Sequence, residues 1–138
     1  MKRILILPLI CLALALTACN SHLTNTPNQT SQIVITTAGV NPQAISAPGD
    51  KASINMVVGE KRTYQIMRSV TKDGVTTTTN VTAASDFNFT NPLAASMDVS
   101  GQLTALATGF TTLEVIYRDG NNDPTTDDKV GMDITVAP

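Results

Sequence analysis

Near the end of the chain stands an alternating stretch that decides the fold, Val130-Gly131-Met132-Asp133-Ile134-Thr135-Val136. Apolar residues occupy every second position, and polar or small residues occupy the positions between them. Successive side chains of a β-strand point to opposite faces, so this period of two places one set in a core and the other in water. The stretch therefore predicts a strand with one buried face.

The same pattern recurs upstream in short runs at roughly ten-residue spacing, which is typical of a β-sandwich. The apolar members of these predicted strands are Ile33, Val34 and Ile35; Ile54, Met56 and Val58; Tyr64 and Ile66; Phe87 and Phe89; Met97 and Val99; and Leu113, Val115 and Tyr117. Turn residues separate several of the runs, at Lys72-Asp73-Gly74, Ser100-Gly101 and Asp119-Gly120. No stretch after residue 20 carries a helical stripe, so the sequence predicts an all-β fold, one sandwich over residues 32–138.

Two segments between these runs need separate predictions. Residues 41–50 contain Pro42, Pro48 and Gly49, which predict a loop. Thr76 to Thr79 is predicted to be an edge strand, because threonine is a good strand former. The alternative for this threonine run is a flat face that binds a crystalline or glycan surface.

The first 18 residues are typical of an export signal. Lys2 and Arg3 precede an apolar run from Ile4 to Leu16, which is too short for a membrane span. The run ends in Leu16-Thr17-Ala18-Cys19, which resembles the bacterial lipobox. That resemblance implies cleavage before Cys19, a diacylglycerol on the Cys19 sulfur and an N-acyl lipid on the new amine. The alternative is an ordinary signal peptide that happens to contain a cysteine.

Residues 19–31 are predicted to be the lipidated N-terminus and a flexible tether, because they are polar and lack an apolar period. Two or three lipid chains on Cys19 would hold the protein permanently on a membrane. Asn20 stands where the lipoprotein pattern has aspartate in proteins retained at the inner membrane. The resemblance therefore implies a lipid-anchored protein of the bacterial cell envelope, delivered to the outer membrane.

Cysteine content and charge restrict the remaining possibilities. Cys11 leaves with the signal and Cys19 carries lipid, so the predicted domain has no disulfide and depends on core burial for stability. Loss of Lys2 and Arg3 leaves 7 basic against 11 acidic residues, where the whole chain has 9 against 11. A mildly acidic chain with no basic cluster argues against nucleic acid as a partner.

The order of motifs in the second half resembles the bacterial immunoglobulin-like domain of the group 2 type, found in intimin- and invasin-like adhesins. The resemblance is carried by Val58-Gly59-Glu60, by Asn91-Pro92-Leu93-Ala94-Ala95-Ser96-Met97-Asp98, by Ser100-Gly101-Gln102-Leu103-Thr104-Ala105 and by Ala107-Thr108-Gly109-Phe110-Thr111-Thr112-Leu113-Glu114-Val115. It implies an Ig-like sandwich with a hairpin turn at Gly101, a tight strand entry at Gly109 and core positions at Leu103, Ala105, Leu113 and Val115. The chain has no tryptophan where family members often have one, so Phe87 or Phe89 is expected to fill that space.

The segment from Asp119 to Asp128 is the acidic cluster of the chain and is predicted to be a partner-binding loop, since loops at sandwich ends project from a rigid frame. Its candidate contact residues are Asp119, Asn121, Asn122, Asp123, Asp127 and Asp128. An EF-hand is excluded because Pro124 and Val130 occupy the glycine and bidentate glutamate positions. A solvated connection and a weak calcium site stay open as alternatives.

The residue inventory argues against catalysis. The single histidine, His22, lies in the predicted tether, which leaves neither a Ser-His-acid triad nor a zinc site. We therefore expect a non-enzymatic protein with no cofactor beyond the covalent lipid, no metal and no small-molecule substrate. The predicted function is binding or adhesion to a protein or glycan. The alternative is a structural or accessory subunit of an outer-membrane or periplasmic complex.

Overall fold

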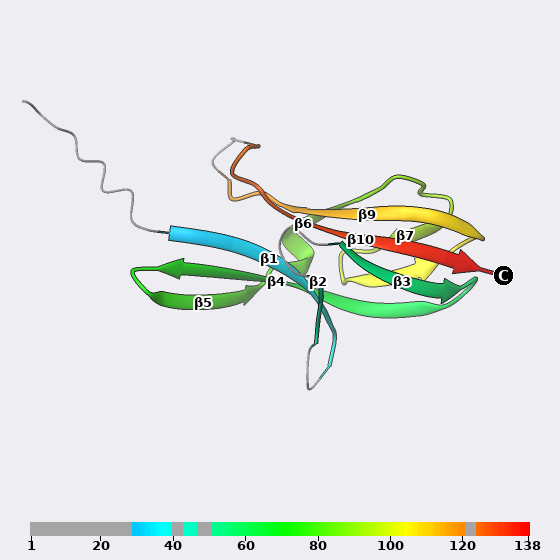
Figure 1. Cartoon of the computed structure of the whole chain (residues 1–138), viewed down its shortest axis with the longest axis horizontal. Helices are drawn as coiled ribbons and strands as arrows, with labels where there is room; N and C mark the ends of the chain where they lie inside the picture. The colour runs from blue at the N-terminus through cyan, green and yellow to red at the C-terminus, as the bar shows by residue number, and fades with distance from the viewer. Residues whose placement is uncertain (1–28, 40–42, 47–50, 121–123) are drawn as a thin grey trace, which may run out of the picture.

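The computed structural model describes residues 29–39, 43–46, 51–120 and 124–138, and these residues are almost entirely β-structure (Figure 1). The strands are β1 (Gln29–Thr37), β2 (Ala44–Ser46), β3 (Lys51–Val57), β4 (Lys61–Lys72), β5 (Val75–Asn80), β6 (Ser85–Phe89), β7 (Ala95–Met97), β8 (Gln102–Ala105), β9 (Gly109–Tyr117) and β10 (Asp128–Ala137). A single 3-10 turn, η1 (Thr82–Ala84), interrupts the described strands.

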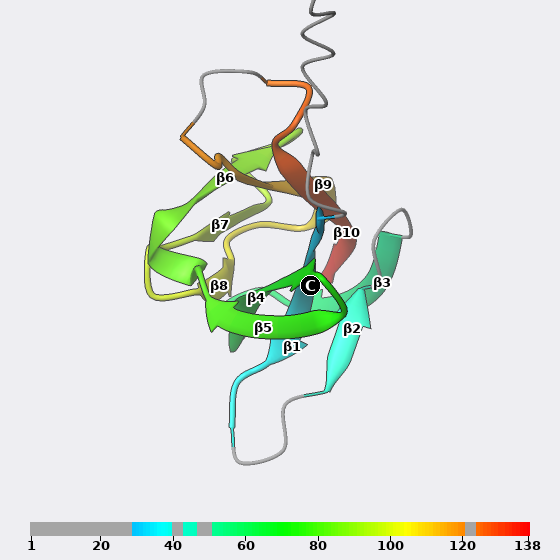
Figure 2. The same cartoon turned by 90° about the vertical axis from the view of Figure 1, so that its left-hand side faces the viewer.

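Two sheets pack face to face, as both views of the ribbon show (Figures 1 and 2). One sheet has the order β2-β1-β4-β8-β7, with β5 added beside β4, and the other has the order β3-β10-β9-β6. The strand β10 lies in the interior of its sheet, parallel to β3 and antiparallel to β9. The predicted all-β sandwich is therefore confirmed.

The core forms where the inward faces of the two sheets meet. All four apolar residues of the alternating stretch, Val130, Met132, Ile134 and Val136, are buried. They pack in one cluster with Ile33, Ile35, Ile66 and Leu103 from the opposite sheet. Each large apolar side chain buried in this way stabilises the fold by about 1.5–3 kcal/mol. The core positions expected at Leu103, Ala105, Leu113 and Val115 are likewise confirmed.

The turn before β8 requires glycine for two reasons. Gly101 has φ +84°, a left-handed conformation that side chains with a Cβ disfavour. A Cβ at this position would also clash with the Tyr64 carbonyl oxygen. The turn is fixed by Asp98, whose Oδ1 accepts hydrogen bonds from the Ser100 hydroxyl and the Gln102 N–H, and these bonds lower the pKa of the Asp98 carboxyl. The predicted hairpin turn at Gly101 is confirmed.

The domain begins earlier than expected, since β1 starts at Gln29 and not at Gln32. Gln29, Thr30 and Ser31 pair with Lys72, Thr71 and Val70 of β4. These three residues are polar, so alternation cannot identify them as a strand, and the prediction that residues 29–31 belong to the tether is wrong. Residues 1–28, including the predicted signal, lie outside the described residues.

Three smaller predictions also need correction. The expected loop over residues 41–50 contains the short strand β2, whose Ala44 and Ser46 pair with β1. Val58, predicted to alternate with Met56 on a strand, lies in the turn after β3 and is exposed. Val99 lies beyond β7 in a turn with 72% of its surface exposed, so it is not a core residue. In each place a turn or a neighbouring strand overrides the local pattern.

Candidate functional site

The predicted partner-binding loop connects β9 to β10 at the end of the sandwich where β1 begins (Figure 1). Asn121, Asn122 and Asp123 lie outside the described residues, as does the predicted lipidation site, Cys19. Asp119, Asp127 and Asp128 are described. The three aspartates differ in their contacts, and this difference decides what each can contribute to a binding surface.

Asp128 points into the protein and not toward a partner. Its carboxylate accepts hydrogen bonds from Arg68 Nε and from the Ser31 hydroxyl, both at 2.8 Å. The side chains of Arg68 and Asp128 are 19% and 9% exposed. The guanidinium of Arg68 also stacks over the Tyr117 ring, 4.8 Å from its centroid. Asp128 therefore ties β10 to both β1 and β4, which is a structural role.

Asp127 and Asp119 also have partners within the protein. Arg118 places Nη1 3.7 Å from Asp127 and Nε 2.8 Å from Asp86, and the hydrogen bond to Asp86 raises the pKa of Arg118. Asp119 accepts a hydrogen bond from the Thr126 hydroxyl at 3.2 Å. The negative charge of this loop is thus partly neutralised by arginine, which weakens the case for a strongly acidic docking surface.

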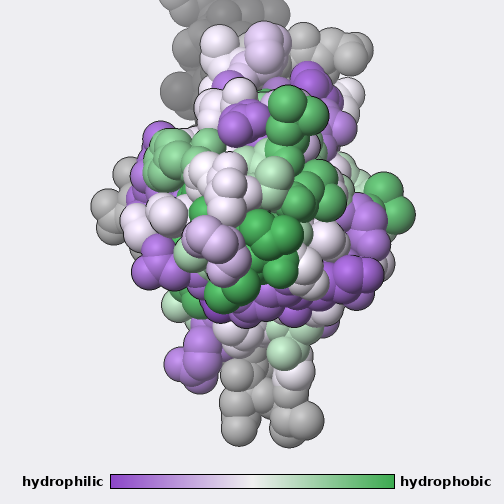
Figure 3. Space-filling model, turned by 90° about the vertical axis from the view of Figure 1, so that its right-hand side faces the viewer, coloured by the Kyte–Doolittle hydropathy of each residue, from purple (hydrophilic) through white to green (hydrophobic). Residues whose placement is uncertain are grey.

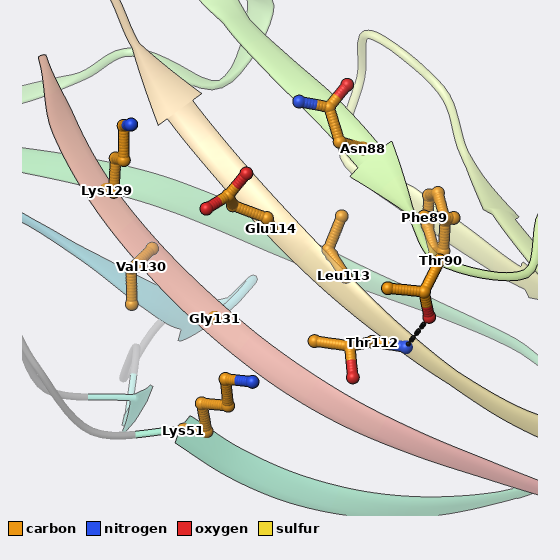
Figure 4. A pocket seen from close by; sticks show the side chains of 10 residues that line it. All are labelled: Lys51, Asn88, Phe89, Thr90, Thr112, Leu113, Glu114, Lys129, Val130 and Gly131. Atoms are coloured by element: carbon orange, nitrogen blue, oxygen red, sulfur yellow. Dashed lines mark hydrogen bonds between the residues drawn. The ribbon is translucent and has the colours of Figure 1, made fainter.

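A second candidate is a groove of about 430 Å³ on the outward face of the sheet β3-β10-β9-β6 (Figure 4). One row of paired residues crosses it in the order Lys51, Gly131, Glu114 and Asn88. Gly131 lies in the interior of β10 and has no side chain to fill the row. The groove is therefore a shallow depression over Gly131, with Lys51 on one side and Glu114 on the other.

The groove carries charges of both signs. Lys51 and Lys129 contribute two ammonium groups, and Glu114 contributes a carboxylate between the strands (Figure 4). Among the described residues, neither lysine lies within 4 Å of a carboxylate. The aliphatic part of Lys51 leans over Gly131, with Cγ 3.1 Å from the position of an added Cβ. This arrangement suits a polar ligand with several hydrogen-bonding groups.

A third candidate is an exposed apolar surface at the opposite end of the sandwich, which we call the apolar end. It consists of Val57, Val58, Leu93, Leu106 and Phe110, all large hydrophobic residues that are exposed. Leu93 is 78% exposed and Phe110 is 56% exposed. Backbone hydrogen bonds bring the segments together, from Val58 to Ala137 and from Leu106 to Ala94. Figure 3 shows hydrophobic side chains gathered on this face.

A charged pair borders the apolar end. Arg62 Nε donates to Glu60 Oε1 at 2.6 Å, and this hydrogen bond lowers the pKa of the Glu60 carboxyl, with a further contribution from the Val57 N–H. Arg62 also donates to the Asn55 carbonyl at 2.8 Å. An apolar centre with a polar rim is the usual composition of a protein–protein interface.

Comparison with known protein families and with curated proteins gave no match to the chain. Within the described ranges, no three His, Cys, Asp or Glu side chains form a group that could hold a metal ion. No helix in the described part of the chain is long and apolar enough to cross a membrane.

The sequence did not reveal the apolar end, although one signal was present. Phe110 has the same parity along β9 as Thr112 and Glu114, which predicts an outward-facing aromatic ring. Leu93 and Leu106 lie between strands, where no alternation applies. Arg68, the partner of Asp128, is 60 residues away in sequence, so no local sequence pattern indicated this ion pair.

Proposed function

We propose that this chain is a lipid-anchored protein of the bacterial cell envelope whose Ig-like sandwich is a non-enzymatic binding module. The signal and Leu16-Thr17-Ala18-Cys19 support the anchor, and Asn20 supports delivery to the outer membrane. The order of strand motifs supports the Ig-like family. The observation that carries the binding role is the apolar end, because isolated soluble domains rarely expose a large contiguous apolar surface.

The partner we infer for the apolar end is another envelope protein that presents an apolar surface. Phe110 would be its main anchor, since exposed aromatic side chains dominate the energy of many interfaces. Gln29 enters the domain at the other end of the sandwich (Figure 1), so attachment through the N-terminus leaves this surface accessible. Permanent docking would make the chain an accessory subunit, and transient docking would make it an adhesion module.

A glycan is the second partner class, and one observation favours it. The groove over Gly131 offers Asn88, Glu114 and two lysines, and Phe89, Leu113 and Val130 also line it. Hydrogen-bonding side chains beside apolar ones can contact both the hydroxyl groups and the apolar face of a sugar. Retention on immobilised glycans that is lost in Glu114→Gln, with Phe110→Ser unaffected, would favour this second candidate.

The experiment that tests the main proposal places a photo-crosslinking amino acid at Phe110 in the full chain, in living cells. We expect one identified envelope protein to cross-link, and we expect Phe110→Ser to abolish its co-purification. Val99→Ser is the matched control, because Val99 is also a large exposed apolar residue but lies outside the apolar end. Equal co-purification by both variants would contradict docking through the apolar end.

The anchor is tested separately with Cys19→Ala. We expect loss of labelling by a fatty-acid analogue and accumulation of uncleaved precursor. Protease treatment of intact cells then separates the two roles, because a surface adhesin is released and a periplasm-facing subunit is spared. Unchanged labelling in Cys19→Ala would contradict the lipid anchor and leave the binding role to the Phe110 experiment.

A further inference from the structure

An open strand edge runs along β5, at the opposite end of the sandwich from the apolar end. All six residues from Val75 to Asn80 are exposed, and none of them is charged. On one side β5 pairs with β4, and on the other side no described strand covers it. The β4–β5 hairpin projects beyond the second sheet (Figure 1). An exposed edge of this kind is a template for pairing with another chain.

The register identifies the backbone groups that this edge leaves open. Lys72 and Val75 flank the two-residue turn Asp73-Gly74 and form the hydrogen-bonded pair that closes it. At the other end of β5, the Val81 N–H donates to the Ile66 carbonyl at 2.8 Å. Odd-numbered residues therefore form the hydrogen-bonded pairs with β4 along the whole strand. The even-numbered residues of β5 therefore direct N–H and C=O away from β4. These residues are Thr76, Thr78 and Asn80.

The threonine side chains do not compete for these outward groups. The Thr76 hydroxyl is hydrogen bonded to the Thr71 hydroxyl at 2.8 Å, and the Thr78 hydroxyl to the Ser69 hydroxyl at 3.0 Å. Both bonds hold the side chains against β4, on the face of the sheet. The outer edge of β5 therefore presents a regular series of backbone donors and acceptors.

The strand β3 shows how the same fold blocks another edge. Arg62 donates to the Asn55 carbonyl, and the Val57 N–H donates to Glu60, so one ion pair occupies backbone groups of β3 on the side away from β10. Charged side chains are a common means of preventing edge-to-edge association. The edge of β5 carries no charged group of this kind, whereas backbone groups of β3 at Asn55 and Val57 are occupied.

We propose that β5 pairs with β5 of a second copy of this chain, antiparallel about a two-fold axis at Thr78. This register sets Thr78 against Thr78 of the partner subunit and Thr76 against Asn80 of the partner subunit. In this register all three outward residues of each copy form hydrogen-bonded pairs, which gives about six backbone hydrogen bonds. A two-fold axis at Thr77 would form fewer of these bonds. The uncharged strand brings no like charges together, and the same surface serves both copies. The apolar end stays uncovered, so this inference is independent of the proposed function.

Cysteine cross-linking tests the register in the full chain, exported to an oxidising compartment. Opposite residues of a hydrogen-bonded antiparallel pair have Cα atoms about 5.5 Å apart, which is within the range of a disulfide. We expect Thr78→Cys to form a covalent dimer that the unsubstituted chain does not form. Thr76→Cys is the matched control, on the same strand and face, because the two copies of Thr76 would be about 14 Å apart. No dimer from Thr78→Cys, or equal dimer from both variants, would overturn the proposal.

A second pair of variants tests the association itself. The Thr78 N–H points outward, so Thr78→Pro removes an edge donor without removing a bond to β4. We expect the purified full chain to sediment as a dimer and Thr78→Pro to sediment as a monomer that still unfolds in one cooperative transition. If Thr78→Pro does not fold, Thr78→Lys gives the same test by setting two positive charges opposite each other. A dimer that persists in Thr78→Lys would overturn the proposal.

Discussion

Two aspartate–arginine pairs in this protein share one geometry and differ in burial. Arg68 Nε lies 2.8 Å from Asp128, and Arg118 Nε lies 2.8 Å from Asp86. The first pair is 19% and 9% exposed, and the second is 63% and 53% exposed. Burial weakens solvent screening, and it also makes an arginine without its partner costly. The two pairs therefore compare a buried ion pair with an exposed one at equal distance between Nε and the carboxylate.

We expect Asp128→Asn to lower the free energy of unfolding by about 3 kcal/mol, because it leaves the Arg68 charge uncompensated between the sheets. Asp86→Asn removes a contact of equal length at the surface, where solvent screens the charges, and should cost clearly less. Urea unfolding of both variants measures the difference. Equal losses would show that burial does not control the strength of the Arg68 pair.

The same reasoning changes how recognition by the Asp119–Asp128 loop should be tested. A variant that replaces every aspartate of the loop would also remove the bonds from Arg68 and Ser31 to Asp128. If such a variant no longer bound a partner protein, the cause could be a destabilised fold as easily as the loss of a contact with that partner. A useful test leaves Asp128 unchanged and confirms the melting temperature first.

Among the elements, β10 provides the sharpest test of the core. Ile134 is fully buried, and its neighbour Thr135 is exposed on the other face of the same strand. Truncation of a buried isoleucine to alanine typically costs about 2–5 kcal/mol. We expect Ile134→Ala to fall in that range and Thr135→Ala to stay within about 0.5 kcal/mol, measured by denaturant unfolding. Similar losses in the two variants would contradict the register of β10.

The alternation of apolar and polar residues predicted the strands that have one face in the core and the other in solvent. The strands β9 and β10 each bury one face, so Leu113, Val115 and Ile134 could be placed in the core from their spacing. The polar start of β1 gave no signal, because Gln29 to Ser31 are held by backbone bonds to β4. Backbone hydrogen bonds between strands do not depend on side-chain polarity, so the alternation of apolar and polar residues does not reveal them.

The candidate surfaces were less predictable than the strands for a related reason. The apolar end gathers residues from the end of β3 and the turn after it, the segment before β7, the segment after β8 and the start of β9. Their proximity is a property of the sheet topology, which sequence spacing alone does not give. The acidic loop was visible because it is contiguous, but the contacts of Asp128 depend on strands far away in sequence.

At the scale of the whole molecule, the two ends of the sandwich differ in character. One end carries the entry of β1, the Arg68–Asp128 pair and the open edge of β5. The other end carries the exposed apolar residues around Phe110. A protein attached through its N-terminus would therefore have self-pairing near the attached end and partner binding at the far end. The two proposed interactions use different surfaces and do not exclude each other.

The last prediction concerns the N-terminal boundary of the domain. It tests whether residues 29–31 stabilise the end of the sandwich at which β1 begins. A fragment that begins at Gln32 lacks the pairing of Gln29, Thr30 and Ser31 with β4, and it also lacks the Ser31 bond to Asp128. Net hydrogen bonds contribute about 0.5–1.5 kcal/mol each. We expect a fragment of residues 29–138 to unfold in one cooperative transition, and a fragment of residues 32–138 to be less stable by about 1–3 kcal/mol.

Ser31→Ala in the longer fragment separates the two contributions, because it removes the bond to Asp128 and keeps the backbone pairing. We expect this variant to lie between the two fragments in unfolding midpoint. Reductant should change none of the three curves, since both cysteines, Cys11 and Cys19, precede the fragments. Identical midpoints for the two fragments would mean that residues 29–31 contribute nothing to the fold, and would return the boundary to Gln32.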